Sequence, residues 1–323
     1  MKKSPVLLFL FRLLGFILIL VVMDFIAGTG LKKIYFAQKK GQLAQTTYAI
    51  DSAKQDILIF GSSRADRHYS PAILTKGTNL SCYNLGRDAE KIPYYAAVQE
   101  VAFKRNRPKL VILDMNANEL IANEAKYFKL SLLLPYCDKH PELIKYVEEI
   151  SPYEKYKIYS KIYPYNSMLF IMLNNLFFGN NIPKDEFGYQ PLTGSLTVEQ
   201  TKNIITRKNA FDEKEKKENR VKIDPKSVSY YKQFLQKTLD SNIKTVVVIS
   251  PSLVKEPEIY RLQLKEISSA YPNVIFLDYT DDPKYSLQNQ KFADMFHLNK
   301  QGSEEFSNDL ALLLRNKGLL SNQ

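Results

Sequence analysis

The 323-residue sequence predicts an α/β protein, a doubly wound parallel five-stranded sheet with a helical insertion and an N-terminal transmembrane helix. Three observations predict this fold. Short apolar runs alternate with helical patterns, the alternation stops over a long central stretch, and the N-terminus is almost continuously apolar. Runs that are apolar on both faces are typical of a parallel sheet covered by helices on each side. The expected organisation is an anchor over residues 1–30, a juxtamembrane stalk over 31–52 and an α/β domain over 53–323.

The N-terminal segment reads PVLLFLFRLLGFILILVVMDFIA over residues 5–27, interrupted only by Arg12 and Asp24. About 20 apolar residues are enough to cross the hydrocarbon core of a bilayer. A cleaved signal peptide is the alternative, but this apolar region is longer than the usual ~7–15 residues and no A-x-A site follows it. An uncleaved anchor is therefore favoured. Lysines flank both ends, so the charge rule alone leaves the orientation open.

Five apolar runs are the candidate strands of the sheet. They are Asp56–Phe60, Leu80–Leu85, Leu110–Met115, Thr245–Ser250 and Asn273–Asp278. Three helices between and after them have recognisable ends. Asp88 is expected to cap a helix that runs to about Arg105, Asp224 caps one with Pro225 in its first turn, and the last runs from near Asn299 to Lys317, before Gly318.

The central stretch from about residue 121 to 226 is too long for a plain loop, so we expect an inserted helical cap over the carboxyl edge of the sheet. It holds a tyrosine-rich section over residues 146–165, an apolar run over 168–178 and a charged run from Asp212. The charged run predicts an exposed helix or linker. The tyrosines fit a sugar-stacking platform, but aromatic residues at such spacing more often build core and interface.

The amino-acid composition excludes some classes of function. With 45% hydrophobic residues the chain is not disordered, and its net charge of +11 suits contact with anionic lipid or polymer. The charge is dispersed and no nucleic-acid motif occurs, so nucleic-acid binding is not expected. Cys82 and Cys137 leave a single disulfide open, although Cys82 lies in a candidate strand and is expected simply to pack. No His, Asp or Glu cluster has metal-ligand spacing, so neither a metal nor a cofactor is expected.

Polar residues of catalytic types follow two strands and precede the last helix. Ligands of open α/β sheets bind outside the carboxyl ends of the strands, and there Ser63 follows the first strand. Asp294 and His297 lie three residues apart in a turn, so the carboxylate can orient the imidazole as in a serine-hydrolase triad. Beyond the third strand, Asn116 and Asn118 are candidate donors to a developing oxyanion.

Taken together, these blocks resemble the SGNH/GDSL hydrolase superfamily, whose fold is flavodoxin-like. The sequence offers Gly61-Ser62-Ser63, Asn84-Leu85-Gly86, Asn116-Ala117-Asn118-Glu119 and Asp294-x-x-His297 in the order of that superfamily. The resemblance covers about residues 55–120 and 225–320, and leaves out the insertion. Two blocks depart from the pattern, because Ser62 replaces the usual aspartate and N-A-N-E replaces GxND. These departures put the substrate range in doubt and leave the three triad positions intact.

The resemblance implies a role for each matched residue. Ser63 would be the nucleophile, His297 its general base and Asp294 the residue that orients His297. The oxyanion hole would combine the backbone amides of Ser63 and Gly86 with the side chain of Asn118, with Asn116 as a rival donor.

The longer string GSSRADRHYSP is similar to a subgroup of envelope-anchored bacterial SGNH-like proteins, which resemble the domains of polysaccharide O-acetylation and teichoic-acid D-alanylation systems. This implies a single-pass protein of the inner, or cytoplasmic, membrane with an extracytoplasmic catalytic domain. Arg64 and His68 lie close to Ser63 in the sequence. We expect Arg64 and Asp66 to be structural ion-pairing residues and His68 to have no catalytic role.

Two functions are compatible with these observations. The first is a serine esterase or O-acyltransferase that acts, through an acyl-enzyme, on acyl esters of a cell-envelope glycan or lipid. The second is a catalytically inactive module that binds polysaccharide or organises an envelope complex. The expected partners are the membrane, the acylated substrate and other envelope proteins.

Overall fold

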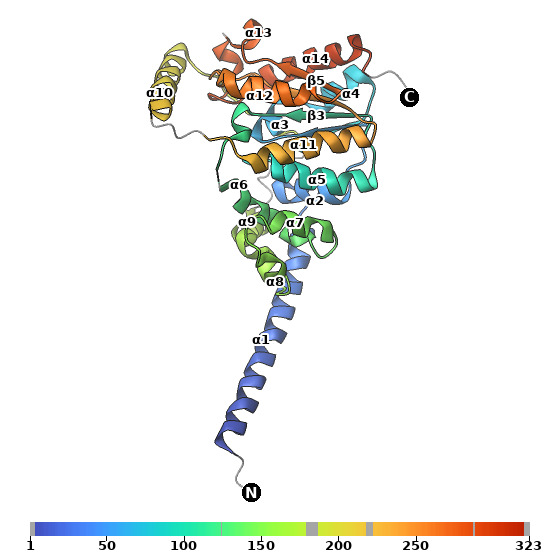
Figure 1. Cartoon of the computed structure of the whole chain (residues 1–323), viewed down its shortest axis with the longest axis vertical. Helices are drawn as coiled ribbons and strands as arrows, with labels where there is room; N and C mark the ends of the chain where they lie inside the picture. The colour runs from blue at the N-terminus through green and yellow to red at the C-terminus, as the bar shows by residue number, and fades with distance from the viewer. Residues whose placement is uncertain (1–3, 124, 179–186, 218–221, 287, 320–323) are drawn as a thin grey trace. The chain divides into compact units, whose positions relative to one another are not determined.

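The structure is a computed structural model that describes residues 4–123, 125–178, 187–217, 222–286 and 288–319. The chain divides into two compact units (Figure 1). The first combines Met1–Ala44 with Tyr127–Pro183, and the second, the α/β unit, combines Gln45–Lys126 with Lys184–Gln323.

The α/β unit contains the predicted parallel sheet. Its strands are β1 (Ile57–Phe60), β2 (Cys82–Asn84), β3 (Leu110–Asp114), β4 (Lys244–Ile249) and β5 (Val274–Asp278). All neighbouring pairs are parallel and the order is β2-β1-β3-β4-β5, which confirms the predicted fold class. This is the order of flavodoxin-like sheets. In such sheets the order in which strands are added reverses between β1 and β3, and ligands bind at the carboxyl ends of those two strands.

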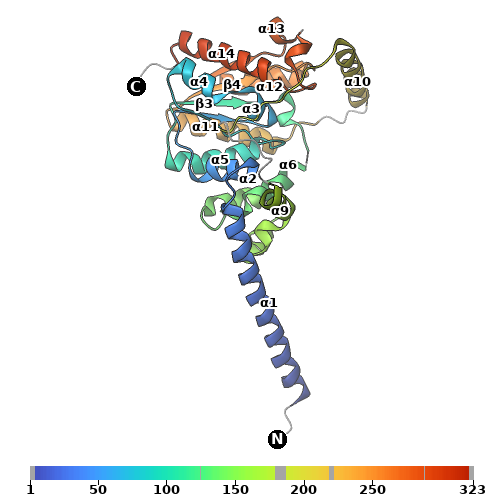
Figure 2. The same cartoon turned by 180° about the vertical axis from the view of Figure 1, so that it is seen from behind.

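Helices cover both faces of the sheet (Figures 1 and 2). On one face, α4 (Pro71–Thr78) and α14 (Lys300–Asn316) pack over alternate strand residues in a fully buried core. On the other face, α11 (Pro225–Asp240) packs against α5 (Ile92–Arg105) and brings the ring of Phe234 to 5.2 Å from that of Phe60. Both faces of β1 to β4 are therefore buried, as their apolar sequence predicts, whereas the edge strand β5 is partly exposed.

Further helices belong to the unit wholly or in part. They are α2 (Gly41–Asp51), α3 (Ser63–His68), α6 (Ala125–Phe128), α10 (Val198–Lys217), α12 (Glu258–Ser269), α13 (Pro283–Ser286) and 3-10 helices over Ala117–Leu120 and Asn289–Lys291. The beginning of the charged run lies in α10. Its continuation over residues 218–221 falls outside the described residues.

Two of the three predicted helix starts are correct. The carboxylate of Asp224 accepts a hydrogen bond from the amide of Lys226, and the side chain of Asn299 accepts one from Gly302, so both residues are N-caps. The prediction for α5 is wrong, because this helix begins at Ile92. Ala89 has a φ of 62°, which interrupts a helix started at Asp88, and Asp88 forms an ion pair with Arg67 instead.

The first unit contains α1 (Pro5–Phe36), which is long and apolar enough to cross a membrane. Its other elements are α7 (Ile144–Val147), α8 (Glu154–Lys157), α9 (Leu169–Phe178) and 3-10 helices over Lys129–Tyr136, Pro141–Leu143 and Tyr163–Met168. The helix continues beyond the predicted anchor, and Tyr35 in the predicted stalk is buried, with its hydroxyl 3.0 Å from that of Tyr136.

The tyrosine-rich section of the insertion serves two purposes. Tyr146 and Tyr165 are buried in the first unit, whereas Tyr153, Tyr156 and Tyr159 are exposed. Two of the six tyrosines of the section therefore build core. The predicted position of the insertion over the carboxyl edge of the sheet stays a prediction. Cys82 and Cys137 are both free and buried.

Candidate active site

Ser63 is the first residue of α3, directly beyond the end of β1. The turn between them depends on Gly61, whose φ is 150°. A Cβ at this position would lie 2.8 Å from the carbonyl oxygen of Asp114 and 2.8 Å from the Cβ of Ala65. Only glycine fits both the backbone conformation and the space, and the tight turn leaves the Ser63 side chain partly exposed at the sheet edge.

The structure brings Ser63 and His297 together although they lie far apart in the sequence. The Oγ of Ser63 is 2.7 Å from Nε2 of His297, and Nδ1 of His297 is 2.9 Å from Oδ2 of Asp294. A carboxylate only accepts hydrogen bonds, so Nδ1 carries the proton that faces Asp294. Nε2 then presents its lone pair to the Ser63 hydroxyl, which is the tautomer that a general base requires.

Asp294 remains ionised in this arrangement. Partial burial raises the pKa of its carboxyl group, but hydrogen bonds from the His297 ring and from the Phe296 and His297 amides outweigh burial, and the pKa lies below its ordinary value. The side chain of Asp294 is 48% exposed and that of His297 is 16% exposed. The site is therefore open to solvent on the Asp294 side while the imidazole is mostly covered.

The three oxyanion donors expected from the resemblance have different surroundings in the structure. The Ser63 amide lies at the first turn of α3, where N–H groups have no partner within the helix. The Gly86 amide instead donates a 2.9 Å hydrogen bond to Oδ1 of Asn84. The side chain of Asn118 is exposed and makes no hydrogen bond within the described part of the chain. The assignment of Gly86 and Asn118 as donors stays a prediction.

Asn116, the rival donor, is the asparagine that lies next to the candidate nucleophile. Its Nδ2 donates a 3.1 Å hydrogen bond to Oγ of Ser62. It also hydrogen-bonds the buried carboxylate of Glu119, which is held in turn by Lys91 at 3.2 Å. Because β1 and β3 are neighbours, the residues just beyond their ends meet, and Asn116 is placed beside the Ser62-Ser63 pair.

Arg64 is a structural residue, as expected. Its guanidinium is buried, with Nη2 2.5 Å from Oε1 of Glu256 and Nε 3.7 Å from Oδ1 of Asp114. Burial lowers the pKa of Arg64, but the two carboxylates outweigh burial and raise it. The guanidinium also donates to the carbonyl oxygens of Met115 and Ser250, and thereby ties the ends of β3 and β4 to the start of α3.

His68 is a buried residue that holds the backbone next to the candidate base. It is fully buried, its Nε2 accepts a 3.0 Å hydrogen bond from the Leu298 amide, and its Nδ1 lies 3.0 Å from Oγ of Ser250. Burial, followed by the nearby His297, lowers the pKa of His68 well below its ordinary value. His68 is therefore a neutral imidazole that fixes the backbone next to His297.

Sequence reasoning missed Glu256 and Ser250 as supporting residues. Ser250 follows β4 and could have been noticed, because it lies at the same sheet edge as Ser63. Glu256 lies in the following loop, and no local pattern connects it to Arg64. Across the described residues, no group of three or more His, Cys, Asp or Glu side chains could hold a metal ion.

The comparisons with known proteins are distant. No protein-family model and no curated protein sequence matches the chain. Among solved structures, one similar chain is a provisionally assigned platelet activating factor from Streptococcus pneumonia, with 11% identity and a TM-score of 0.41 over 94% of this chain and 98% of that one. Another is a provisionally assigned acylhydrolase from Bacteroides fragilis, with 10% identity and a TM-score of 0.39 over 85% of this chain and 95% of that one. Likenesses this distant say nothing about catalysis, so the function rests on the geometry of the site.

Proposed function

We propose that this protein is an SGNH-type serine esterase or O-acyltransferase that acts on acyl esters of a cell-envelope glycan or lipid. One observation carries the proposal, the continuous hydrogen-bonded chain from Ser63 Oγ through the His297 imidazole to the Asp294 carboxylate. Three side chains of these types, in this order and within hydrogen-bond reach, form the arrangement that activates a serine hydroxyl.

In the first half of the reaction, Oγ of Ser63 attacks the acyl carbonyl carbon while its proton moves to Nε2 of His297. The imidazolium that forms is stabilised by the ionised Asp294. As the tetrahedral intermediate collapses, the ester C–O bond breaks and His297 returns the proton to the departing alkoxide. The products of this half are an alcohol and an acyl-enzyme on Ser63.

In the second half, an acceptor hydroxyl attacks the acyl-enzyme and gives its proton to His297. The bond between the acyl carbon and Ser63 Oγ then breaks, and His297 returns the proton to Oγ, which restores the free serine. Water as the acceptor gives hydrolysis, and a hydroxyl of a glycan or lipid gives acyl transfer. The residues of this chain perform the same proton transfers in both cases, so both reactions belong to one proposal.

The side chain of Asn116 is the best-placed donor for the oxyanion of the tetrahedral intermediate. Its amide points at Ser62 Oγ, next to the attacking serine, and Glu119 holds its orientation. An oxyanion would replace Ser62 Oγ as the acceptor of this hydrogen bond. One such donor contributes about 3–4 kcal/mol of transition-state stabilisation in serine hydrolases.

We further propose that α1 anchors the protein in the cytoplasmic membrane and that the α/β unit faces the extracytoplasmic side. The length and the exposed apolar surface of α1 support a membrane-spanning role. The orientation rests on the resemblance to envelope-anchored proteins, and it would place Ser63 in the compartment that contains envelope glycans and lipids.

Replacing the nucleophile tests the proposed function directly. Ser63→Ala removes the attacking oxygen, so hydrolysis of a small acetyl ester should fall by about 10⁴-fold or more while the protein remains folded. Ser269→Ala is the matched control, because Ser269 is an exposed serine on α12 of the same unit. If the folded wild-type protein shows no turnover, yet binds glycan equally well with and without Ser63, the inactive binding module is the correct function.

A further inference from the structure

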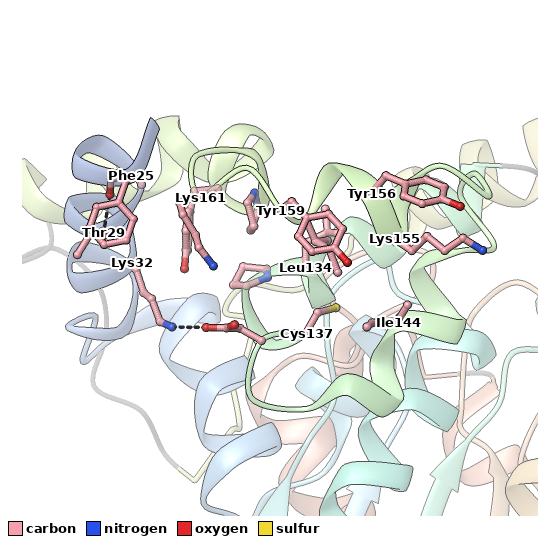
Figure 3. A pocket seen from close by; sticks show the side chains of 16 residues that line it. Phe25, Thr29, Lys32, Leu134, Cys137, Ile144, Lys155, Tyr156, Tyr159 and Lys161 are labelled. Carbon is pink, nitrogen blue, oxygen red and sulfur yellow. Dashed lines mark hydrogen bonds and ion pairs between the residues drawn. The ribbon is translucent and has the colours of Figure 1, made fainter. Parts of the chain in front are cut away.

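A groove in the first unit is lined by residues other than those of the candidate active site. It has a cavity volume of about 800 Å³ and is formed by the last part of α1 and residues from the segment 134–165 (Figure 3). Phe25, Thr29 and Lys32 contribute the α1 side of the groove, and Tyr159 and Lys161 lie opposite them. None of these residues takes part in the chemistry proposed for Ser63.

The groove lies at a defined depth along α1. The carboxylate of Asp24 accepts hydrogen bonds from Oγ of Ser160 and from the amides of Lys161 and Ile162, at 2.6, 2.7 and 3.2 Å. A side chain at Gly28 would collide with the backbone of Lys161, so the loop and the helix are in direct contact. These contacts fix the loop at the level of the Asp24–Gly28 turn.

That level is the edge of the predicted bilayer core. The exposed large apolar residues of α1 extend from Val6 to Ile26, which is about the length that crosses a hydrocarbon core. At a rise of about 1.5 Å per residue, the lining from Phe25 to Lys32 extends about 10 Å beyond that edge. The groove therefore begins at the hydrocarbon boundary and extends through the layer of lipid headgroups.

The lining matches the chemistry of that layer. Tyr156 and Tyr159 line the groove with side chains that are 62% and 79% exposed, and tyrosine is enriched where membranes meet water. Three lysines also line it. Lys32 pairs with Asp138 at 2.8 Å and Lys155 pairs with Glu148 at 3.0 Å.

Lys161 is the groove lysine whose ammonium forms no ion pair within the described residues, unlike those of Lys32 and Lys155. Asp24 and Asp138 act on the charge of Lys161 electrostatically, but the lining as a whole contains three lysines and one aspartate, so the groove keeps a positive excess. A cation on the headgroup side of a tyrosine-lined and largely apolar groove is complementary to a ligand with an anionic head and an apolar tail.

We propose that this groove binds a membrane phospholipid with an anionic headgroup. The phosphate of this lipid contacts the Lys161 ammonium, and its acyl chains lie along the apolar part of α1 on the N-terminal side of Phe25. The inference rests on the proposed membrane-spanning role of α1 and is independent of the catalytic role of Ser63. The lysine charge also explains the lipid class, because a zwitterionic headgroup carries its own cation and gains less from Lys161.

The chain contains no tryptophan, so a single introduced tryptophan reports on one position. The full-length Tyr159→Trp protein is reconstituted in vesicles of equal phosphatidylcholine and phosphatidylglycerol, with bromine on the acyl chains of one lipid at a time. Bromine quenches the fluorescence of a nearby tryptophan. We expect brominated phosphatidylglycerol to occupy the groove with a preference of about fivefold, the effect of one lysine near a membrane surface.

Four controls assign the preference to the groove. Phe16→Trp, a lipid-exposed position in the middle of α1, should be quenched equally by both lipids. Adding Lys161→Gln to Tyr159→Trp should abolish the preference, whereas Lys265→Gln, the same charge change on α12, should leave it intact. Free inorganic phosphate in the buffer should not displace the lipid.

Each opposite result overturns the inference. Equal quenching of Tyr159→Trp by both lipids would show that the groove does not select an anionic headgroup. Quenching of Phe16→Trp without quenching of Tyr159→Trp would place the groove outside the bilayer. Loss of the preference in phosphate buffer would identify a free-anion site. Absence of quenching at both positions would show that α1 does not cross the bilayer. Ester turnover by the same preparation would then show that the proposed catalysis does not depend on this inference.

Discussion

Asp294 has two roles that depend on different hydrogen bonds. Its Oδ1 accepts the amides of Phe296 and His297 at 2.8 and 3.0 Å, which shapes the turn whether or not the imidazole is protonated. Its contacts with Nδ1 of His297 select the tautomer that leaves Nε2 free to accept the Ser63 proton. One side chain thus sets both the position and the protonation of the candidate base.

The two asparagines beyond β3, Asn116 and Asn118, provide a test of single residues. Asn116→Ala should lower kcat about 10²–10³-fold with little change in KM, because it removes a donor that acts on the oxyanion of the transition state. Asn118→Ala should have the smaller effect, since the Asn118 side chain is exposed. Steady-state kinetics on a small ester compares the two variants. A larger loss at Asn118 would contradict the assignment to Asn116 and restore the donor implied by the superfamily pattern.

Among the secondary-structure elements, α3 connects the nucleophile to the loop of the base. Ser63 lies at its start and His68 at its end, and His68 holds the Leu298 amide next to His297. A neutral His68 is required, because a protonated ring has no lone pair to accept that amide. His68 is therefore a positioning residue that keeps Ser63 and His297 at the correct distance from each other.

This contact predicts a pH dependence of stability. The pKa of His68 is lowered in the folded state, so the unfolded state binds the proton more readily. The stabilisation is fully present above the unfolded pKa of about 6.5 and is lost as the pH falls below it, by at most about 1.4 kcal/mol per pH unit. We expect the thermal midpoint of the detergent-solubilised wild-type protein to decrease as the pH is lowered from about 7.5 to about 5.5.

The His68→Gln variant isolates this effect. Glutamine supplies a neutral acceptor of similar reach, so the variant should be less stable at neutral pH by about 1–3 kcal/mol and should lose less stability on acidification. His140 and His297 are present in both proteins, so the difference between the two pH profiles belongs to His68. An identical pH profile for wild type and variant would show that His68 is not a buried neutral acceptor.

The sequence predicts the sheet well because β1 to β4 are almost entirely runs of consecutive buried residues, a pattern that is local. It also places Ser63, Asp294 and His297 correctly at strand and helix ends, because in a parallel sheet the carboxyl ends of strands meet at one edge. What it could not predict depends on contacts between distant segments. The approach of Asn116 to Ser62 and the pairing of Arg64 with Glu256 arise only when β1, β3 and β4 are assembled. The start of α5 was missed for a local reason, the positive φ of Ala89.

For the whole molecule, the central question is the side of the membrane on which the α/β unit lies. Both native cysteines are buried, so an introduced cysteine can be labelled selectively. Ile259→Cys places a thiol at a residue that is 70% exposed on α12. An impermeant maleimide should label this variant in intact spheroplasts of a bacterial host. Labelling only after lysis would place the α/β unit in the cytoplasm and contradict the proposed orientation.

The most direct test of the proposed chemistry is to find which residue a serine-directed phosphonate modifies. The reagent is applied to the folded full-length protein, and the modified peptide is identified by mass spectrometry. We predict a single adduct on Oγ of Ser63, and loss of that adduct in His297→Ala, because without the imidazole no base accepts the serine proton. An unmodified wild-type protein, or an adduct on another serine that persists in Ser63→Ala, would contradict the account.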